Sequence, residues 1–270
     1  MRRAIRAAVA VAVATVAGCA PVAPTAAAKV VSGPVFEDFL GPAGAPPNPA
    51  YWTPDIGSSA EHGWERGSLQ TYTDAPDNLA LDGYGNLVIT ARRSGGDYTS
   101  ARITSRSKLS FPYGTVAARI KFPSGQGLWP AFWMVGADID TVGWPACGEI
   151  DIMEIINTGT RFNIALHGPS ADVEQKGSID DLTGDFHTYW MNRREGAVTV
   201  GVDDATLATF TAESLPDGAP WVFDGPMFVL LNLAVGGDWP GPPDSSTPFP
   251  SAMVVDWFSF QPPDSADSQE

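Results

Sequence analysis

Cysteine and histidine are both scarce in this chain, which limits the covalent chemistry open to it. Its 270 residues include two cysteines, Cys19 and Cys147, and three histidines. Because Cys19 falls in a predicted targeting segment, a disulfide between two structural cysteines of the mature chain is excluded. No histidine or asparagine pattern accompanies Cys147, so we interpret it as a small buried thiol rather than a nucleophile.

Basic residues are also few. Lysine and arginine total 16 against 31 aspartates and glutamates, which gives a formal net charge of −15. This balance argues against nucleic acid or anionic lipid as a partner, since both repel an acidic surface. A hydrophobic content of 44% with 17% charged residues indicates a folded chain rather than a disordered one. We expect a monomer.

The N-terminal residues have the pattern of an export signal. Three arginines in the first six residues precede an apolar run, Ala7–Ala17, that is too short to span a bilayer as a mature helix. The run continues into the letters VAGC, an ending that resembles a bacterial lipobox. This pattern predicts a signal peptide over 1–19, lipidation of Cys19 and anchoring at the cell surface. Cleavage after residue 28, with free secretion to the extracellular space, is the alternative.

Composition divides the rest of the chain into a tether, one domain and a tail. Residues 20–34 are rich in proline and alanine and predict a tether, and residues 263–270 predict a frayed acidic tail. In the domain between them, residues 35–262, short apolar segments alternate with turn residues, which is typical of an all-β sandwich or jelly roll. The predicted strands are Asn86–Arg93, Gly114–Phe122, Arg161–Gly168, Ala197–Asp204, Met227–Val235 and Met253–Phe260. The continuous apolar run Met227–Val235 predicts a strand that is covered on both faces.

The segment GEIDIMEI, residues 148–155, places three acids in an apolar strand. Side chains of a strand alternate between its faces, so Glu149 and Asp151 share one face and Glu154 would point to the other. The apolar positions also slip by one residue at this point. A β-bulge near Met153 explains the slip and returns Glu154 to the face of the other two acids.

Three carboxylates in one row repel each other, so the row needs a purpose. Bound Ca²⁺ is one, because hard cations take clustered oxygens. Glycoside hydrolysis with retention is another, because it uses an ionised carboxylate as nucleophile beside a protonated carboxyl as acid. Spacing along the strand does not tell which glutamate has which role. A solvated acidic strand is the least favoured interpretation, since isoleucine and tryptophan surround the acids.

The acid segment resembles the E-x-D-x-x-E motif of family-16 glycoside hydrolases, in the bulged form of the laminarinase-like members. Five further segments resemble the family in the expected order. They are Phe36–Gly44, Asn78–Ala91, Gly125–Gly136, Leu231–Gly241 and Ser246–Trp257. The resemblance covers residues 36–261 and implies a concanavalin A-like β-jelly roll, in which two curved antiparallel sheets form a concave substrate cleft.

The same resemblance implies a retaining endo-glucanase that acts on β-1,3-glucan without a catalytic cofactor. By motif position, Glu149 matches the nucleophile, Glu154 the acid/base and Asp151 an assisting carboxylate. The polar segment 168–185 departs from the family pattern and leaves the substrate open, with β-1,3-1,4-glucan and galactan as alternatives. Transglycosylation and non-catalytic glucan binding on the same fold are alternative functions.

Aromatic residues near the acids are candidates for stacking against sugar rings. Trp129 and Trp133 share one face of their strand, which we assign to the cleft rather than to the core from the position of the motif. Trp144 precedes the acids and is expected to form a wall of the cleft. Trp239 lies in a loop rich in glycine and proline, where a contact at the rim is the better interpretation.

A histidine also falls on the acid face. The strand Arg161–Gly168 should pair antiparallel with the acid strand across a short turn, which brings His167 within reach of Asp151 or Glu154.

Four polar residues are assigned from the resemblance alone. Asn78 and Arg102 occupy positions that resemble sugar-contacting residues of the family. Glu37 and Asp256, together with backbone carbonyls, resemble the ligands of a structural Ca²⁺ on the convex side of the fold.

Overall fold

The computed structural model describes residues 28–62 and 65–263. The predicted signal peptide with Cys19, and residues 264–270 of the predicted tail, lie outside the described residues. No helix in the described part is long and apolar enough to cross a membrane.

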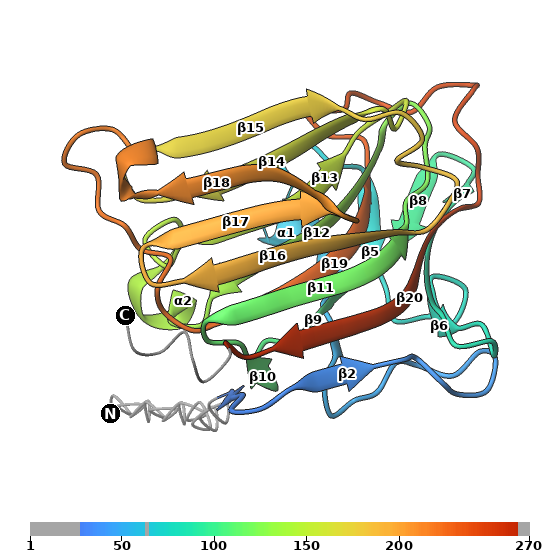
Figure 1. The fold of residues 1–270 in the computed structure, drawn as a ribbon. Helices are drawn as coiled ribbons and strands as arrows, with labels where there is room; N and C mark the ends of the chain where they lie inside the picture. Colours follow the sequence, from blue (N-terminus) through green and yellow to red (C-terminus); the bar gives the residue numbers. More distant parts are fainter. Residues whose placement is uncertain (1–27, 63–64, 264–270) are drawn as a thin grey trace, which may run out of the picture.

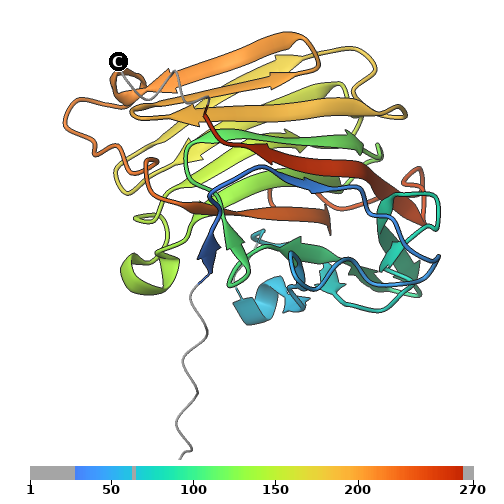
Figure 2. The same cartoon turned by 60° about the horizontal axis from the view of Figure 1, so that its bottom comes forward.

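Two layers of β-strands lie face to face (Figure 1, Figure 2). The layer that carries the acids, here called the cleft sheet, has seven strands among the described residues. In spatial order they are β15 (Asp172–Ser178), β14 (Arg161–His167), β13 (Glu149–Ile155), β12 (Leu128–Gly136), β19 (Met227–Val235), β9 (Arg102–Thr104) and β3 (Thr53–Pro54). All neighbours in this sheet are antiparallel, so each strand presents alternate side chains to the cleft and to the core.

The second layer, here called the outer sheet, has eleven strands in the described part of the chain. Its main path is β18 (Ala205–Thr211), β17 (Ala197–Val202), β16 (His187–Arg194), β11 (Gly114–Lys121), β20 (Ser251–Gln261), β7 (Leu87–Ser94), β8 (Asp97–Ser100), β5 (Gln70–Tyr72) and β4 (Gly57–Ser58). β2 (Val35–Glu37) pairs with β20, and β6 (Leu79–Leu81) pairs with β7. The remaining elements are short: β1 (Lys29–Val30), β10 (Leu109–Ser110), α1 (Ser59–His62), α2 (Ile139–Val142) and the 3-10 helix η1 (Ala212–Ser214).

The predicted β-sandwich is confirmed. β19 has the predicted bounds, and each of its nine residues is buried, as the continuous apolar run required. The main core fills the space between the sheets, where side chains such as Phe132 and Ile150 of the cleft sheet pack with Ile89 and Val116 of the outer sheet. Burial of this apolar surface is the main stabilising term of the fold.

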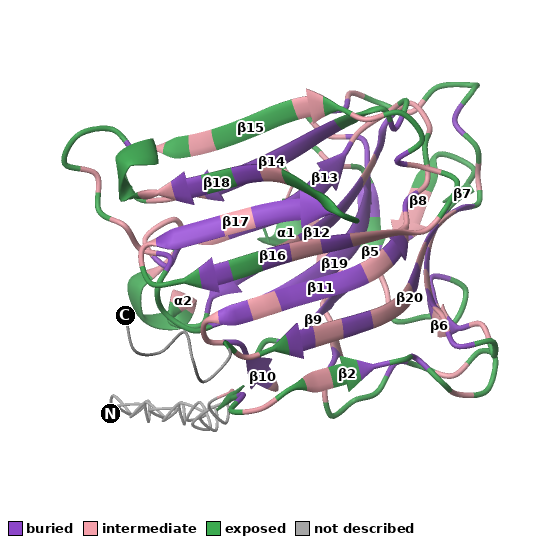
Figure 3. Ribbon diagram, viewed as in Figure 1, coloured by how far each residue is buried: buried purple, intermediate pink, exposed green. Residues whose placement is uncertain are grey.

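The structure differs from the sequence predictions at two places. The predicted tether was too long, because Lys29 and Val30 pair with β10 and Val31 is 8% exposed within the core. The Val31 backbone N–H also donates to the carbonyl of Ser110 at 2.9 Å, so the domain begins near residue 29 rather than at 35. The polar segment 168–185 contains β15, an edge strand whose exposed residues carry no apolar alternation (Figure 3).

One buried cation ties loops to the outer sheet. Arg193 of β16 is 1% exposed, and its guanidinium donates to the carbonyls of Phe223 and Phe111 at 2.7 Å each and to that of Gly225. Burial lowers the pKa of Arg193 to about 10, which measures the cost of holding the charge there. These charged hydrogen bonds compensate for that cost and fix the loop that precedes β19.

We expect Arg193→Met to lower the free energy of unfolding by about 3 kcal/mol, because three buried carbonyls lose a charged donor. Urea denaturation measures the change. Arg194→Met, at the exposed neighbouring position, is the matched control and should change the value by less than about 0.5 kcal/mol. Equal effects of the two substitutions would show that the buried hydrogen bonds do not stabilise the fold.

Candidate active site

A β-bulge in β13 brings the three acids onto one face. Across the β13–β14 pair, Asp151 lies opposite Ala165 and Glu154 lies opposite Asn163, so two residues of β13 stand against the single Ile164. The two bulged residues, Ile152 and Met153, are fully buried in the core. The predicted bulge near Met153 is therefore confirmed, and Glu154 rejoins the face of Glu149 and Asp151.

Strands β12 and β14 supply the residues beside the acids. Directly opposed residues of antiparallel strands share a face, so the cross-strand register identifies these neighbours. On β12 they are Val135, Trp133 and Ala131, which face Glu149, Asp151 and Glu154 in turn. On β14 they are His167, Ala165 and Asn163, in the same order. The small alanines leave space beside Asp151 on the β14 side and beside Glu154 on the β12 side.

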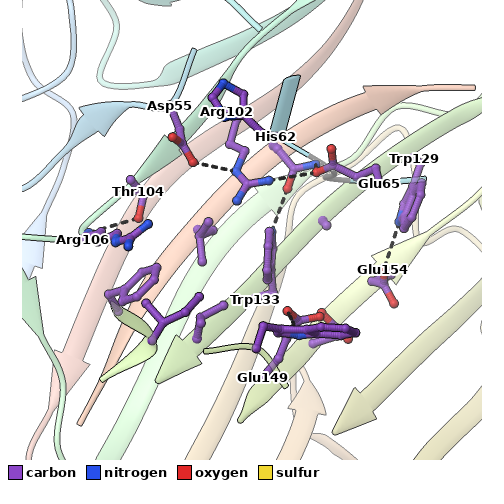
Figure 4. Close-up of a pocket in the computed structure, with 18 of the residues that line it drawn as sticks. Asp55, His62, Glu65, Arg102, Thr104, Arg106, Trp129, Trp133, Glu149 and Glu154 are labelled. Atoms are coloured by element: carbon purple, nitrogen blue, oxygen red, sulfur yellow. Dashed lines mark hydrogen bonds and ion pairs between the residues drawn. The ribbon is translucent and has the colours of Figure 1, made fainter. Parts of the chain in front are cut away.

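A cleft of about 510 Å³ opens over this face (Figure 4). The prediction that Trp129, Trp133 and the acids face the cleft is confirmed, and Trp144 and Arg102 also line it. The full lining consists of Asp55, His62, Glu65, Arg66, Arg102, Thr104, Arg106, Trp129, Ala131, Trp133, Val135, Ile139, Trp144, Glu149, Asp151, Glu154, Phe228, Leu230 and Asn232. The cleft thus extends from β13 across β12 and β19 to β9 and the loops around α1.

Indole N–H groups hold the two outer acids. Trp129 donates to Glu154 Oε1 at 2.8 Å, and Trp144 donates to Glu149 Oε2 at 3.1 Å. The second oxygen of Glu154 accepts from Asn163 Nδ2 at 3.0 Å. These contacts fix the carboxyl groups in the cleft while the tryptophan rings remain beside it, so the aromatic residues have a positioning role in addition to any contact with sugar.

His167 lies against the middle of the row. Its Nε2 is 3.0 Å from Asp151 Oδ2 and 3.9 Å from Glu149 Oε1, and its Nδ1 is 2.9 Å from Asp172 Oδ1 on β15. Burial alone would lower the pKa of His167, but Asp151, Glu149 and Asp172 outweigh it and raise the pKa to about 10. The predicted placement of His167 beside Asp151 is confirmed.

The acids have raised pKa values for a shared reason. Burial is the largest cause for Glu149, Asp151 and Glu154, and the charge of Asp151 raises the pKa of both glutamates further. The His167 cation opposes this rise at both glutamates, and it lies 3.9 Å from Glu149. The three groups titrate together, and the cation favours ionisation at the Glu149 end of the row.

The same cluster has the spacing of a metal site. Oxygen and nitrogen atoms of Glu149, Asp151 and His167 lie within 4.8 Å of one another. Both ring nitrogens of His167 face carboxylate oxygens, so both carry hydrogens and neither has a lone pair for a metal. The chemistry of this donor set therefore fits an ion-paired group and does not fit a metal centre.

A second network holds the far part of the cleft. The Arg102 guanidinium lies 4.9 Å from the centre of the Trp133 ring and pairs with Asp55 at 3.0 Å and Glu65 at 3.3 Å. The Trp133 N–H donates to Asn232 Oδ1 at 2.7 Å. The ring is thus stacked on one side and hydrogen-bonded at its edge, which presents it as a rigid wall.

Two predicted sugar contacts have different outcomes. Trp239 packs edge-on against Trp129, with ring centres 5.3 Å apart and 40% of its surface exposed, as a rim residue would. Asn78 was wrongly predicted to contact sugar, since its amide is buried in hydrogen bonds to Thr73, Thr99 and the Thr90 carbonyl. Asn78 ties the outer-sheet strands together and does not line the cleft.

The two predicted calcium ligands have separate partners in the structure. Glu37 pairs in register with Phe258, a core residue, and its inward carboxylate accepts the Phe39 N–H at 3.1 Å. Asp256 lies where the register of β20 shifts, points outward and forms an ion pair of 2.6 Å with Arg119. The second oxygen of Glu37, Oε2, is buried without a hydrogen-bond partner in the described chain, and Ca²⁺ binding at Glu37 and Asp256 stays a prediction.

Several cleft residues were missed at the level of sequence. Asn232 had a usable signal, because it is the lone polar residue in the apolar run of β19. Asp55, Glu65 and Arg106 had none, since they belong to loops and reach the cleft only through the tertiary fold.

The comparisons with known proteins agree with this geometry. The model of the family described as glycosyl hydrolases family 16 matches residues 64–259. The beta-glucanase of Rhodothermus marinus is 37% identical over 229 residues, which cover 78% of this chain and 79% of that protein. The endo-beta-1,3-glucanase structure from Pyrococcus furiosus is 37% identical with a TM-score of 0.77, covering 84% of this chain and 93% of that one.

A second solved structure gives the same result. The catalytic domain of an endo-1,3-beta-glucanase (laminarinase) from Thermotoga petrophila RKU-1 is 36% identical with a TM-score of 0.76, covering 84% of this chain and 95% of that one. Other relatives are longer, and this chain spans 31%, 46% and 33% of three of them.

A β-sandwich that presents a row of carboxylates on the floor of an aromatic cleft defines a glycoside hydrolase. The chain belongs to glycoside hydrolase family 16, and its fold is the β-jelly roll of that family. Hydrolysis in this family needs no catalytic cofactor.

Replacing Glu149 with glutamine is expected to stabilise the protein at alkaline pH. Burial beside Asp151 raises the pKa of Glu149 above its usual 4.5, so folding favours the neutral form. Neutral Glu149 makes its full contribution to the free energy of unfolding below pH 4.5. This contribution is lost as the pH rises through the folded-state pKa. We expect the Tm of Glu149→Gln to exceed that of the unaltered protein by about 3 °C at pH 8 and to match it near pH 4.

Glu195→Gln, in the exposed turn between β16 and β17, is the matched control and should leave the Tm unchanged at both pH values. A lower Tm for Glu149→Gln at pH 8 would contradict the electrostatic account of the row.

Proposed function

We propose that the protein is an exported, retaining endo-β-glucanase that hydrolyses β-1,3-glucosidic bonds of laminarin-type glucans. The carboxylate row of Glu149, Asp151 and Glu154 on the cleft floor is the observation that carries this proposal. The activities named for the Rhodothermus, Pyrococcus and Thermotoga relatives support the substrate class. The tryptophan-lined cleft suits a neutral polymer, because sugar rings stack on aromatic faces.

The first step of the proposed mechanism forms a covalent glycosyl-enzyme. Glu149 attacks the anomeric carbon as the ionised nucleophile, and Glu154 protonates the leaving glycosidic oxygen. Motif position assigns the shared proton to Glu154, and the His167 cation, 3.9 Å from Glu149, favours the ionised form of Glu149. Protonated Glu154 keeps its hydrogen bonds from Trp129 and Asn163, since a carboxyl hydroxyl oxygen still accepts.

The second step releases the sugar. Glu154, now ionised, deprotonates a water molecule that attacks the same carbon and frees Glu149. Asp151 assists through its charge, which raises the pKa of Glu154 and so favours the protonated acid that the first step needs. The configuration at the anomeric carbon is retained after two inversions.

A panel of polysaccharides tests the substrate. We expect the unaltered protein to release reducing ends from laminarin faster than from mixed-linkage β-1,3-1,4-glucan, and none from galactan. Release from the mixed-linkage glucan alone would move the assignment to that substrate. Products longer than the substrate would indicate transglycosylation, and glucan binding without any release would indicate a binding module.

Substitution of the outer acids tests the residue roles. We expect Glu149→Gln and Glu154→Gln each to lower kcat on laminarin by at least about 10³-fold, whereas Glu195→Gln keeps full activity. With an aryl β-glucoside, azide should rescue Glu154→Ala as a β-glycosyl azide, because the covalent intermediate still forms. Rescue of Glu149→Ala should give the α-glycosyl azide by direct attack. An α-glycosyl azide from Glu154→Ala and a β-glycosyl azide from Glu149→Ala would show that Glu154 is the nucleophile and Glu149 the acid/base.

We also propose that residues 1–19 direct export and that Cys19 is lipidated, from the apolar run and lipobox-like ending alone. In a bacterial host given labelled palmitate, the protein should carry the label and fractionate with membranes. Cys19→Ala should remove both properties. An unlabelled protein in the medium whose N-terminus is residue 29 would favour free secretion instead.

A further inference from the structure

One histidine is held between carboxylates from two different strands of the cleft sheet. Asp151 of β13 lies 3.0 Å from Nε2 of His167, and Asp172 of β15 lies 2.9 Å from Nδ1. The ring is about one-fifth exposed and Asp151 is nearly buried, whereas the Asp172 side chain is 59% exposed. Asp172 therefore contacts His167 from the solvent side, and His167 in turn contacts the buried Asp151.

With both carboxylates ionised, this geometry requires His167 to be an imidazolium. A neutral imidazole carries one N–H, and its other nitrogen presents a lone pair. With a carboxylate oxygen at hydrogen-bond distance from each nitrogen, a neutral ring would set a lone pair against an anionic oxygen. Two N–H donors satisfy both contacts, and the positive charge compensates for two of the surrounding negative charges.

We propose that Asp172 is a positioning residue that holds His167 as an imidazolium, so that the cation keeps Glu149 ionised for nucleophilic attack. This inference rests on the proposed function and adds a residue on the exposed edge strand β15 to it. Asp172 does not line the cleft and acts only through His167.

The distribution of protons over the site explains why such a residue is needed. In the productive state Glu154 is protonated, His167 carries a proton on each ring nitrogen, and Glu149 is ionised. Transfer of the histidine proton to Glu149, 3.9 Å away, leaves the total number of protons unchanged but removes the nucleophile. The charge of Asp172 opposes this transfer, because it stabilises the imidazolium and lies beyond the ring from Glu149.

The surroundings of His167 contain few competing groups. Within the described chain, the titratable groups that face it are Asp151 and Glu149 from β13 and Asp172 from β15. The Trp144 ring, 6.4 Å away, is uncharged. Glu174, two residues after Asp172 on the same face of β15, affects Asp151 through its charge and is paired with Lys176 at 2.5 Å.

Asp172→Asn tests the proposal with the full chain. An asparagine amide can donate to a neutral Nδ1, so the substitution removes the requirement for the cation while preserving the shape of the side chain. We expect the pKa of His167, followed by NMR of isotopically labelled histidine, to fall by at least about one unit. Because the pKa of His167 starts at about 10, we expect kcat on laminarin to fall relative to the unaltered protein increasingly as the pH rises above 7, with KM changed less than twofold, since no sugar contact is removed.

Glu174→Gln is the matched control, because it removes an equal charge from the same strand face without touching His167. It should leave the His167 pKa within about 0.3 units and kcat unchanged. His187, which pairs with Asp203 on the outer sheet, provides an internal reference signal in every spectrum.

The outcomes separate the inference from the function it rests on. An unchanged His167 pKa in Asp172→Asn, an unchanged kcat, or an equal effect of Glu174→Gln would each overturn the role of Asp172. If the unaltered protein hydrolyses no glucan, the proposed function fails and the catalytic part of this inference fails with it. The NMR titration still decides in that case whether Asp172 holds the cation.

Discussion

The β-bulge at Ile152 and Met153 is the constraint on which the site depends. In a regular strand Glu154 would point into the core, where an acid has neither water nor a partner. The extra residue rotates it to the cleft, where Trp129 and Asn163 donate to it. The bulge is held in place because both of its own side chains are buried between the sheets, so the packing of the core sets the geometry of the acids.

The other residues of the site reduce the electrostatic repulsion among the three acids. Burial and mutual repulsion raise the proton affinity of the three carboxylates. One shared proton and the His167 cation compensate for the repulsion. His167 supplies the cation from β14, directly across from Glu149. Indole N–H groups of Trp129 and Trp144, rather than further cations, hold the outer glutamates.

Much of this arrangement follows from the sequence, because hydrophobic phase and strand alternation are local properties. The one-residue slip of the apolar positions in residues 148–155 predicted the β-bulge. The antiparallel register across the hairpin to the next strand predicted that His167 lies on the acid face. The faces of Trp129 and Trp133 needed the position of the motif as well, since alternation alone does not distinguish cleft from core.

The contacts that were missed concern partners distant in sequence. Asp256 pairs with Arg119, 137 residues earlier, a contact that the local sequence does not reveal. Asn78 was assigned to sugar from the family resemblance, whereas its amide joins outer-sheet strands through hydrogen bonds to Thr90 and Thr99. Asp172 was not singled out because the edge strand β15 is polar on both faces and has no readable period.

The central claim is that the bulged row makes Glu149 the nucleophile. A 2-deoxy-2-fluoro β-glucan oligosaccharide with a good leaving group traps the glycosyl-enzyme, because the fluorine slows its hydrolysis more than its formation. Mass spectrometry of proteolytic fragments then locates the sugar. The account predicts a single ester on Glu149, and an ester on Glu154 or Asp151 would contradict it.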